Sequence, residues 1–147
     1  MKAVIQRVSS SSVRIEGETV GSIGRGYMIL LGVMEGDTQE DIDKLVRKIL
    51  KLRLFPDACG RFDKNIVDID GEVLVVSQFT LAAKIKKGNR PDFTAAMRPS
   101  EAKKLYEAFV ARLREFLPVQ TGVFGAMMDV EIHNDGPVTI LADSALL

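Results

Sequence analysis

The sequence of 147 residues has no tryptophan, only one cysteine and one histidine, and no formal net charge. A single cysteine, Cys59, excludes an intramolecular disulfide, and with one histidine it gives no set of metal ligands of recognisable spacing. The balance of 20 basic and 20 acidic residues excludes a global field that would draw the whole protein onto a polyanion. We therefore expect a reducing environment, no structural metal, and at most local contacts with nucleic acid.

Long apolar runs are also missing. No stretch approaches the roughly 18 to 20 apolar residues that span a bilayer, and Arg7 interrupts the N-terminal segment before a signal-peptide core develops. These absences predict a soluble, cytoplasmic protein without a membrane partner. The length suits one core and not two, so residues 1–147 are expected to form a single domain.

The chain does contain several short β-rich runs separated by turn residues. They lie at residues 2–8, 12–16, 19–23, 27–33, 72–78, 127–133 and 138–141. The spacing predicts antiparallel strands, with the run at 27–33 as a buried central strand. Glu16-Gly17 is a turn signal, and the Gly136-Pro137 pair predicts a tight connection between the last two strands.

Two amphipathic helical patterns accompany these strands. The first is expected to begin at Asp37 or Thr38 and the second at Pro99 or Ser100. Their apolar stripes are Ile42, Leu45, Val46, Ile49 and Leu50, and Ala102, Leu105, Tyr106, Phe109, Val110, Leu113 and Phe116. Polar connections are expected at residues 57–71 and 83–100. The predicted fold is α+β, a mostly antiparallel curved sheet or partial barrel with two main helices.

Ser77-Gln78-Phe79-Thr80 places two hydroxyls and an amide at the end of an apolar strand. No histidine or carboxylate lies nearby in the sequence, and an unassisted hydroxyl is a poor nucleophile. From the residues alone, two interpretations stay open. The hydroxyls either satisfy main-chain groups where the strand ends or face a substrate.

His133 is the one candidate for a histidine general base. It alternates with Val130 and Ile132 and shares the parity of Asp129 and Glu131. This alternation predicts a solvent-facing histidine. Cys59 has no basic neighbour closer than Arg61 and is interpreted as incidental.

A basic segment at residues 84–98 directly precedes the second helix. It carries five basic residues against one acid, a local charge of 5 − 1 = +4, from Lys84, Lys86, Lys87, Arg90, Arg98 and Asp92. Such a segment can bind phosphates. A solvated loop would have the same composition, so both interpretations stay open.

At these motifs the chain resembles the D-aminoacyl-tRNA deacylase family. The similarity spans nearly the whole chain through segments in the expected order: 3–8, 74–81, 87–91, 105–109, Thr121-Gly122 with Phe124 and Met128, and 134–139. The resemblance implies hydrolysis of the ester that joins a D-amino acid to the terminal adenosine of tRNA, with no cofactor. Glycyl-tRNA would also be a substrate. The family often has an acidic residue where this chain has Lys84, a difference that bears on tRNA contact and not on the reaction.

The resemblance also implies a homodimer with shared active sites. Each subunit would place its Gly136-Pro137 turn, with the peptide bond cis, into the partner's pocket, where main-chain carbonyls crowd out an L side chain. Arg7 and Gln78 would hold the partner's turn or line the pocket.

For catalysis, the resemblance points to the segment Ser77, Gln78, Phe79 and Thr80. Main-chain N–H groups near Phe79 and Thr80 would stabilise the oxyanion, and the 2′-hydroxyl of the adenosine would assist. Thr80 as a nucleophile is the alternative.

The remaining substrate contacts implied are of two kinds. Phe124 and Met128 would flank the adenine, and the loop with Lys86, Lys87 and Arg90 would contact phosphates. Two rival functions are a non-catalytic nucleic-acid-binding module, based on the basic segment, and an esterase for free small molecules, based on Ser77 and Thr80.

Overall fold

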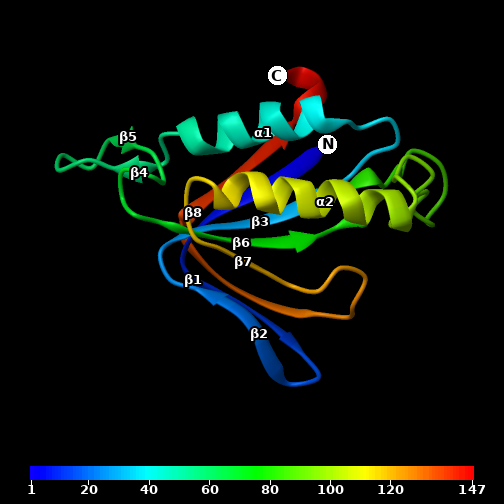
Figure 1. The fold of residues 1–147 in the computed structure, drawn as a ribbon, viewed down its shortest axis with the longest axis horizontal. Helices are drawn as coiled ribbons and strands as arrows, with labels where there is room; N and C mark the ends of the chain where they lie inside the picture. The colour runs from blue at the N-terminus through cyan, green and yellow to red at the C-terminus, as the bar shows by residue number, and fades with distance from the viewer.

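The computed structural model describes all 147 residues. The elements follow in the order β1 (Lys2–Ile15), β2 (Glu18–Ile23), β3 (Gly26–Gly32), α1 (Gln39–Lys51), β4 (Phe55–Pro56), β5 (Phe62–Lys64), β6 (Glu72–Ser77), the 3-10 helix η1 (Phe79–Ala82), α2 (Pro99–Arg114), β7 (Val119–Thr121), β8 (Asp129–Asp143) and the 3-10 helix η2 (Ser144–Leu146). The two predicted helices and the α+β class are confirmed (Figure 1). No helix is both long and apolar enough to cross a membrane.

The main sheet is mixed, with three antiparallel strand pairs, as expected for a mostly antiparallel sheet, and two parallel pairs that the sequence did not predict. Its strand order is β2-β1-β3-β6-β7, and β8 pairs with β1. β1 pairs antiparallel with β2, β3 and β8, whereas β3–β6 and β6–β7 are parallel. The parallel pairs arise because α1 and α2 carry the chain back across the sheet before β6 and β7, and such crossovers place successive strands in the same direction.

The sheet curls until its two ends nearly meet. The first part of β1 pairs with β3 and its last part with β2, so β2 turns away from the plane of β3 and β6. A Cβ atom at Gly21 of β2 would lie 2.6 Å from the main-chain oxygen of Thr121 in β7. Only glycine permits that approach. The expected curved sheet or partial barrel is therefore confirmed.

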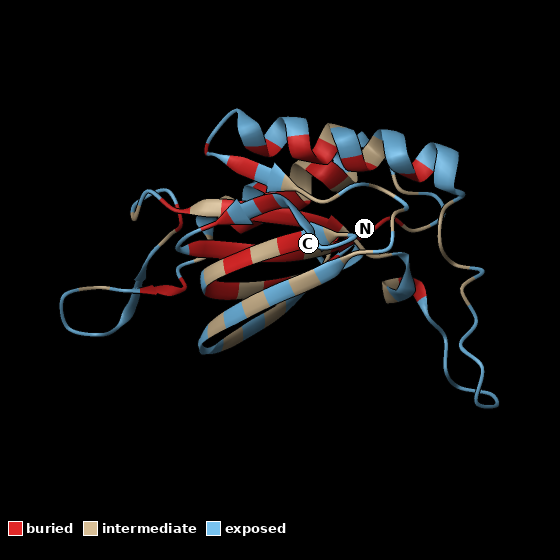
Figure 2. Ribbon diagram, turned by 90° about the horizontal axis from the view of Figure 1, so that it is seen from below, coloured by how far each residue is buried: buried red, intermediate tan, exposed pale blue.

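Two cores lie on the two faces of this sheet. Both helices cover one face (Figure 1), and their inner surfaces are buried while their outer surfaces are exposed (Figure 2). Strand alternation divides β6 between the cores: Val73 and Val75 face the helices, and Leu74 and Val76 face the inside of the curl. The smaller core is closed by the first half of β8.

Both predicted helix starts are correct. α1 begins after Thr38, whose N–H donates to the Asp41 carboxylate at 2.8 Å, and α2 has Pro99 in its first turn. The stripe of α2 was extended too far. The helix ends at Arg114, and Phe116 lies outside it with a half-exposed ring beneath the Arg112 guanidinium.

Three further predictions of local structure need correction. The runs at 2–8 and 12–16 are one strand, β1, because β8 pairs along its whole length. The connection at 57–71 contains part of a two-stranded hairpin, β4–β5. The runs at 127–133 and 138–141 belong to one strand, β8, so Gly136-Pro137 is not a connection between two strands.

Candidate functional site

The end of β6 leads into an exposed single helical turn. Ser77 pairs with Leu31 of β3, and the Gln78 N–H donates to the Leu31 carbonyl at 2.8 Å. The chain then leaves the sheet as η1, in which Phe79 and Thr80 are exposed. The buried strand therefore positions the segment rigidly, while the turn faces solvent.

The chemistry available at this turn is donation, not base catalysis. The Gln78 side-chain amide donates to the Thr80 hydroxyl oxygen, and no histidine or carboxylate is hydrogen-bonded to Thr80 or Ser77. The first N–H groups of a helical turn have no acceptor within it. The main-chain N–H groups of Phe79 and Thr80 are thus available to a substrate oxygen that lies at the start of η1.

The Gly136-Pro137 turn is a wide bulge inside β8. Gln6 pairs with Thr139 and Val8 with Asn134, so the four residues at 135–138 lie opposite one residue of β1. The Asn134 side chain closes the base of the bulge by accepting a hydrogen bond from the Val138 N–H at 2.9 Å. The Gly136–Pro137 peptide bond is cis, in agreement with the expectation, and both residues are exposed.

Arg7 holds the bulge from the opposite strand. Its Nε donates to the Asp135 carbonyl at 3.0 Å, and its Nη1 donates to the Leu54 carbonyl at 2.5 Å. Its guanidinium lies 5.4 Å from the ring centroid of Phe62 on the β4–β5 hairpin. Arg7 therefore contacts the turn of its own chain, and the predicted contact with a partner's turn stays a prediction. The hairpin contact was missed because nothing local links Phe62 to Arg7.

One chain keeps the two motifs apart. Arg7, opposite the bulge, pairs with Tyr27, which pairs with Val73, four residues before Ser77. Four residues along a strand and three strand spacings amount to about 13 Å and about 14 Å respectively. Figure 1 shows the bend in β8 and the end of β6 at opposite ends of the sheet.

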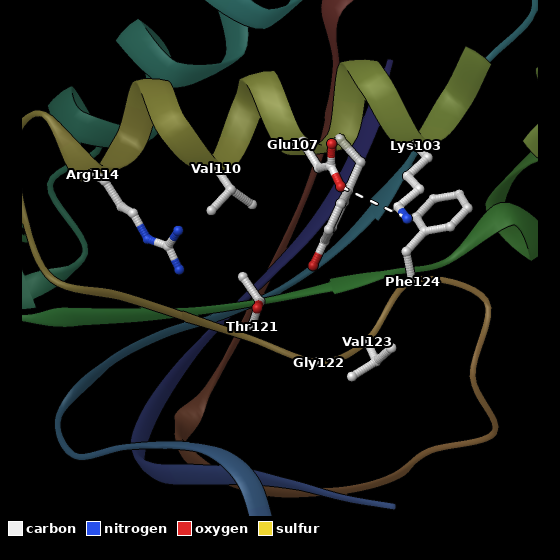
Figure 3. Close-up of a pocket in the computed structure, with 9 residues that line it drawn as sticks. Lys103, Glu107, Val110, Arg114, Thr121, Gly122, Val123 and Phe124 are labelled. Atoms are coloured by element: carbon white, nitrogen blue, oxygen red, sulfur yellow. Dashed lines mark ion pairs between the residues drawn. The ribbon is translucent and has the colours of Figure 1, made fainter. Parts of the chain in front are cut away.

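A groove lies beside β6, between α2 and the connection from β7 to β8 (Figure 3). Its volume is about 320 Å³, and it is lined by Lys103, Tyr106, Glu107, Val110, Arg114, Thr121, Gly122, Val123 and Phe124. This volume is at the lower end of the range for small-ligand sites.

Tyr106 forms the floor of the groove. Its hydroxyl donates to the Val75 carbonyl at 2.9 Å, two residues before Ser77, and burial raises the pKa of Tyr106 to about 12. Its ring lies 5.6 Å from that of Phe124. The helical pattern predicted Tyr106 as one of the buried residues of α2. Its hydroxyl was the only feature of the sequence that indicated a further polar contact.

Of the two residues expected to flank the adenine, Phe124 lines the groove and Met128 does not. Met128 packs against the smaller core inside the curled sheet. Their joint contact with an adenine stays a prediction.

The basic segment forms a projecting loop. Lys84 and Asp92 close its base through two main-chain hydrogen bonds of 2.8 and 3.0 Å. Lys86, Lys87 and Arg90 are all exposed to solvent. Hydrogen bonds from Thr94 lower the pKa of the Asp92 carboxyl, so the one acid of the loop stays ionised.

His133 directly precedes the bulge in β8, and Cys59 lies in the turn of the β4–β5 hairpin; neither is hydrogen-bonded to Ser77 or Thr80. His133 is exposed, as predicted, with its Nε2 2.9 Å from a Glu131 carboxylate oxygen, and this hydrogen bond lowers the pKa of Glu131. Cys59 is an exposed free thiol. No group of three or more His, Cys, Asp and Glu side chains is arranged to hold a metal ion.

Comparison with known proteins decides the family. The model of the family described as D-Tyr-tRNA(Tyr) deacylase matches residues 4–143. The chain belongs to this family. A D-aminoacyl-tRNA deacylase of Nitratiruptor is 63% identical over the full length of both chains, and one of Aquifex aeolicus is 59% identical over 98% of both. The family member described here is therefore a hydrolase of the D-aminoacyl-tRNA deacylase class, as predicted.

Solved structures agree with the fold of the family. One named "c-Myc DNA Unwinding Element Binding Protein" superposes with a TM-score of 0.93 and 46% identity, and the match covers 97% of this chain and 98% of that one. A second, described as a probable eukaryotic D-amino acid tRNA deacylase, has a TM-score of 0.82 at 17% identity, with 96% and 97% covered. The second likeness shows the fold alone.

Proposed function

We propose that this deacylase hydrolyses the ester bond of D-aminoacyl-tRNA, and of glycyl-tRNA, in the cytoplasm, and that it rejects L-aminoacyl-tRNA with main-chain atoms. The observation that carries the proposal is the exposed turn η1, which offers main-chain donors at the end of a buried strand and no base for either hydroxyl. An ester is an activated substrate, so orientation and stabilisation of the oxyanion supply most of what the reaction needs.

In the proposed reaction, the ester carbonyl faces the N–H groups of Phe79 and Thr80. Water attacks the carbonyl carbon, the C–O bond to the ribose breaks, and the ribose oxygen takes up a proton. The 2′-hydroxyl of the adenosine relays protons in place of a protein base. Thr80 as a covalent nucleophile lacks support because its hydroxyl has an amide donor as its neighbour, and an amide does not accept a proton at neutral pH.

Chiral selection is assigned to the Gly136-Pro137 turn of a second copy of the chain. The separation of this turn from Ser77 within one chain supports a homodimer, because a single subunit does not bring the two motifs into one site. Exposed carbonyls of the turn would meet any L side chain. Glycine has no side chain to reject, so glycyl-tRNA would be accepted.

The test is parallel hydrolysis of D-aminoacyl-, L-aminoacyl- and glycyl-tRNA by the same preparation, with the oligomeric state measured in solution. We expect release from the D- and glycyl-forms, an intact L-form and a dimer. Gly136 has a φ of 138°, and a Cβ there would lie 2.8 Å from Val138 Cγ2, so Gly136→Ala should displace the turn and lower selectivity. Gly17→Ala is the matched control because Gly17 also has positive φ but open space around it. Equal hydrolysis of the D- and L-forms by the unaltered protein would refute the filter.

Nucleic-acid binding without catalysis, a rival that the sequence left open, is the second candidate, and it stands against relatives named as deacylases over the full length of the chain. The projecting loop with Lys86, Lys87 and Arg90 favours it, as does the structural relative whose name refers to binding of a DNA element. Purified protein that binds tRNA and leaves the D-aminoacyl ester intact over hours would support this alternative. An esterase for free small molecules predicts instead that hydrolysis of free D-amino acid esters is fast and insensitive to competing tRNA.

A further inference from the structure

The groove between α2 and the β7–β8 connection extends well beyond the space next to Phe124. Lys103, Glu107, Val110 and Arg114 are spaced by four, three and four residues, so they form one stripe along α2. The two cations are eleven positions apart, about 16 Å along the helix axis. Figure 3 shows Arg114 and Lys103 at the two ends of this stripe, with Phe124 at the Lys103 end.

The two cations have donors to spare. Lys103 has a single carboxylate neighbour, Glu107, at 4.0 Å, and its side chain is 57% exposed. Arg114 forms no ion pair and uses its Nε and one Nη to hold the Val119 carbonyl, both at 3.3 Å. A guanidinium has five N–H donors, so three stay available for an anion. Holding the Val119 carbonyl also fixes the direction in which the guanidinium points.

Glu107 lies between these cations. Its side chain is 63% exposed, and its only ion-pair partner is Lys103 at the 4.0 Å limit. A carboxylate between two cations does not suit a continuous run of phosphates. It suits a base that presents an amino group, since Glu and Asp accept hydrogen bonds from N4 of cytosine. The order of cation, carboxylate and cation therefore matches phosphate, base and phosphate.

We propose that this groove binds the nucleotide that precedes the terminal adenosine of the substrate. Lys103 and Arg114 contact phosphates of the single-stranded end on either side of it, more than one nucleotide apart, and Glu107 accepts a hydrogen bond from the amino group of its base, a cytosine in the C-C-A end of tRNA. The wall of Val110, Val123 and Phe124 gives the base an apolar surface, as single-stranded RNA sites commonly do. This inference rests on the proposed function and adds to it three substrate contacts.

The first experiment compares two substrates of different length. D-aminoacyl-tRNA carries the proposed nucleotide, whereas D-aminoacyl-adenosine carries neither the nucleotide nor its phosphates. We expect Lys103→Ala and Arg114→Ala each to lower kcat/KM about tenfold on the tRNA ester, the effect of one charge-assisted hydrogen bond. On the adenosine ester both variants should match the unaltered protein within about twofold.

Controls come from positions of the same helix that do not line the groove. Lys104→Ala and Arg112→Ala remove the same charges from exposed positions whose ion pairs are with Glu101, and with Asp43 and Glu115. They should leave both substrates unaffected. A loss for Lys103→Ala and Arg114→Ala that is equal on both substrates, or absent from both, would overturn the proposal.

The second experiment tests the base. D-aminoacyl esters of the dinucleotides cytidylyl-adenosine and uridylyl-adenosine differ only on one base edge, where cytosine has an amino group at C4 and an acceptor at N3, and uracil has a carbonyl oxygen at C4 and an N–H at N3. We expect the cytidine form to react at least fivefold faster, and Glu107→Gln to narrow that preference, because an amide can accept from cytosine or donate to uracil O4. Equal rates for the two dinucleotides with unaltered protein would refute the base contact.

A binding measurement separates this inference from the proposed function. The trinucleotide C-C-A with a free 3′-hydroxyl is titrated into the unaltered protein and the Arg114→Ala variant. Weaker binding of the trinucleotide by the variant supports the groove as a binding site, whether or not the protein hydrolyses an ester. A lack of ester hydrolysis refutes the proposed function and leaves the binding result as it stands. Binding that is unchanged in the variant refutes the groove whatever the catalytic result.

Discussion

Replacing Arg7 by methionine should weaken both the fold and the selectivity of the enzyme. Arg7 is 7% exposed and is the one side chain that joins the β8 bulge, the residue before the β4–β5 hairpin and the Phe62 ring. Methionine fills similar space but donates nothing. Leu54 is buried, so its carbonyl loses its charged donor and has little access to water.

The expected size follows from these contacts. A hydrogen bond from a charged donor contributes roughly 1.5 to 3 kcal/mol when buried, and the bond to the exposed Asp135 contributes less. Part of this loss of stability is offset, because methionine has no charged group whose burial costs free energy. We therefore expect Arg7→Met to lower the free energy of unfolding by about 2 to 3 kcal/mol. Arg7→Lys should lower the free energy of unfolding by more than half of this amount, because a single ammonium group does not reproduce the guanidinium fork that reaches both carbonyls.

The assay is urea unfolding at one fixed protein concentration, together with the ratio of D- to L-aminoacyl-tRNA hydrolysis. The control is Arg14→Met on the same strand, where the side chain is 49% exposed and pairs with Glu131 at 3.2 Å, so less than about 1 kcal/mol should be lost. Selectivity should fall about tenfold for Arg7→Met, equivalent to about 1.4 kcal/mol of lost discrimination. An Arg7→Met protein as stable and as selective as Arg14→Met would refute the role assigned to Arg7.

Four further outcomes are expected. Thr80→Ala should reduce D-aminoacyl-tRNA hydrolysis far less than the roughly 10⁶-fold loss seen when a true nucleophile is deleted; a loss of that size would make Thr80 the nucleophile. The double variant Lys86→Ala and Lys87→Ala should lower the slope of log affinity for tRNA against log salt by about 1.4, or 0.7 for each lost phosphate contact to a single strand, and an unchanged slope would remove the loop from the RNA contact. Burial raises the pKa of Tyr106 to about 12 in the folded state, so the stability that Tyr106 contributes is complete below pH 10 and is lost as the pH rises toward 12. Tyr106→Phe should therefore make the fall in the free energy of unfolding with pH less steep in urea titrations. Part of the fall should remain, because burial also raises the pKa of Tyr27. Ser144→Ala should cost about 1 to 2 kcal/mol in thermal unfolding, because the buried Ser144 hydroxyl donates to Asp41 at 2.7 Å and accepts from the Met1 amino group at 2.8 Å; no change would show that these contacts do not stabilise the C-terminal end.

The pattern of apolar residues was sufficient for the helices. The stripe Ile42, Leu45, Val46 and Ile49 is buried as expected, since helical periodicity is a property of neighbouring residues along the chain. The same reasoning failed at Phe116, where the apolar spacing continues past the end of α2. Pro118 marks the end of the helix only to within a few residues, because a proline disfavours the helical conformation of the residue directly before it and not that of Phe116.

Strand pairing was harder to predict. The parallel pairing of β3 with β6 depends on the path of α1 across the sheet, and no residue in either strand specifies it. Likewise, Gly136-Pro137 has the composition of a turn in any context. The turn is a bulge in a continuous strand because β1 pairs with β8 on both sides of it. The partner residues in β1 lie more than 120 positions earlier in the chain.

The sequence by itself determined the α+β class, the helices, the exposed His133 and, through motifs in a fixed order, the family. Only the tertiary structure decided how the motifs relate in space. It set Arg7 against the bulge, opened a groove between α2 and the β7–β8 connection, and separated Gly136-Pro137 from Ser77 by most of the sheet. The reason is physical: side-chain periodicity encodes local conformation, whereas register, crossovers and buried polar contacts depend on residues that are distant in the chain.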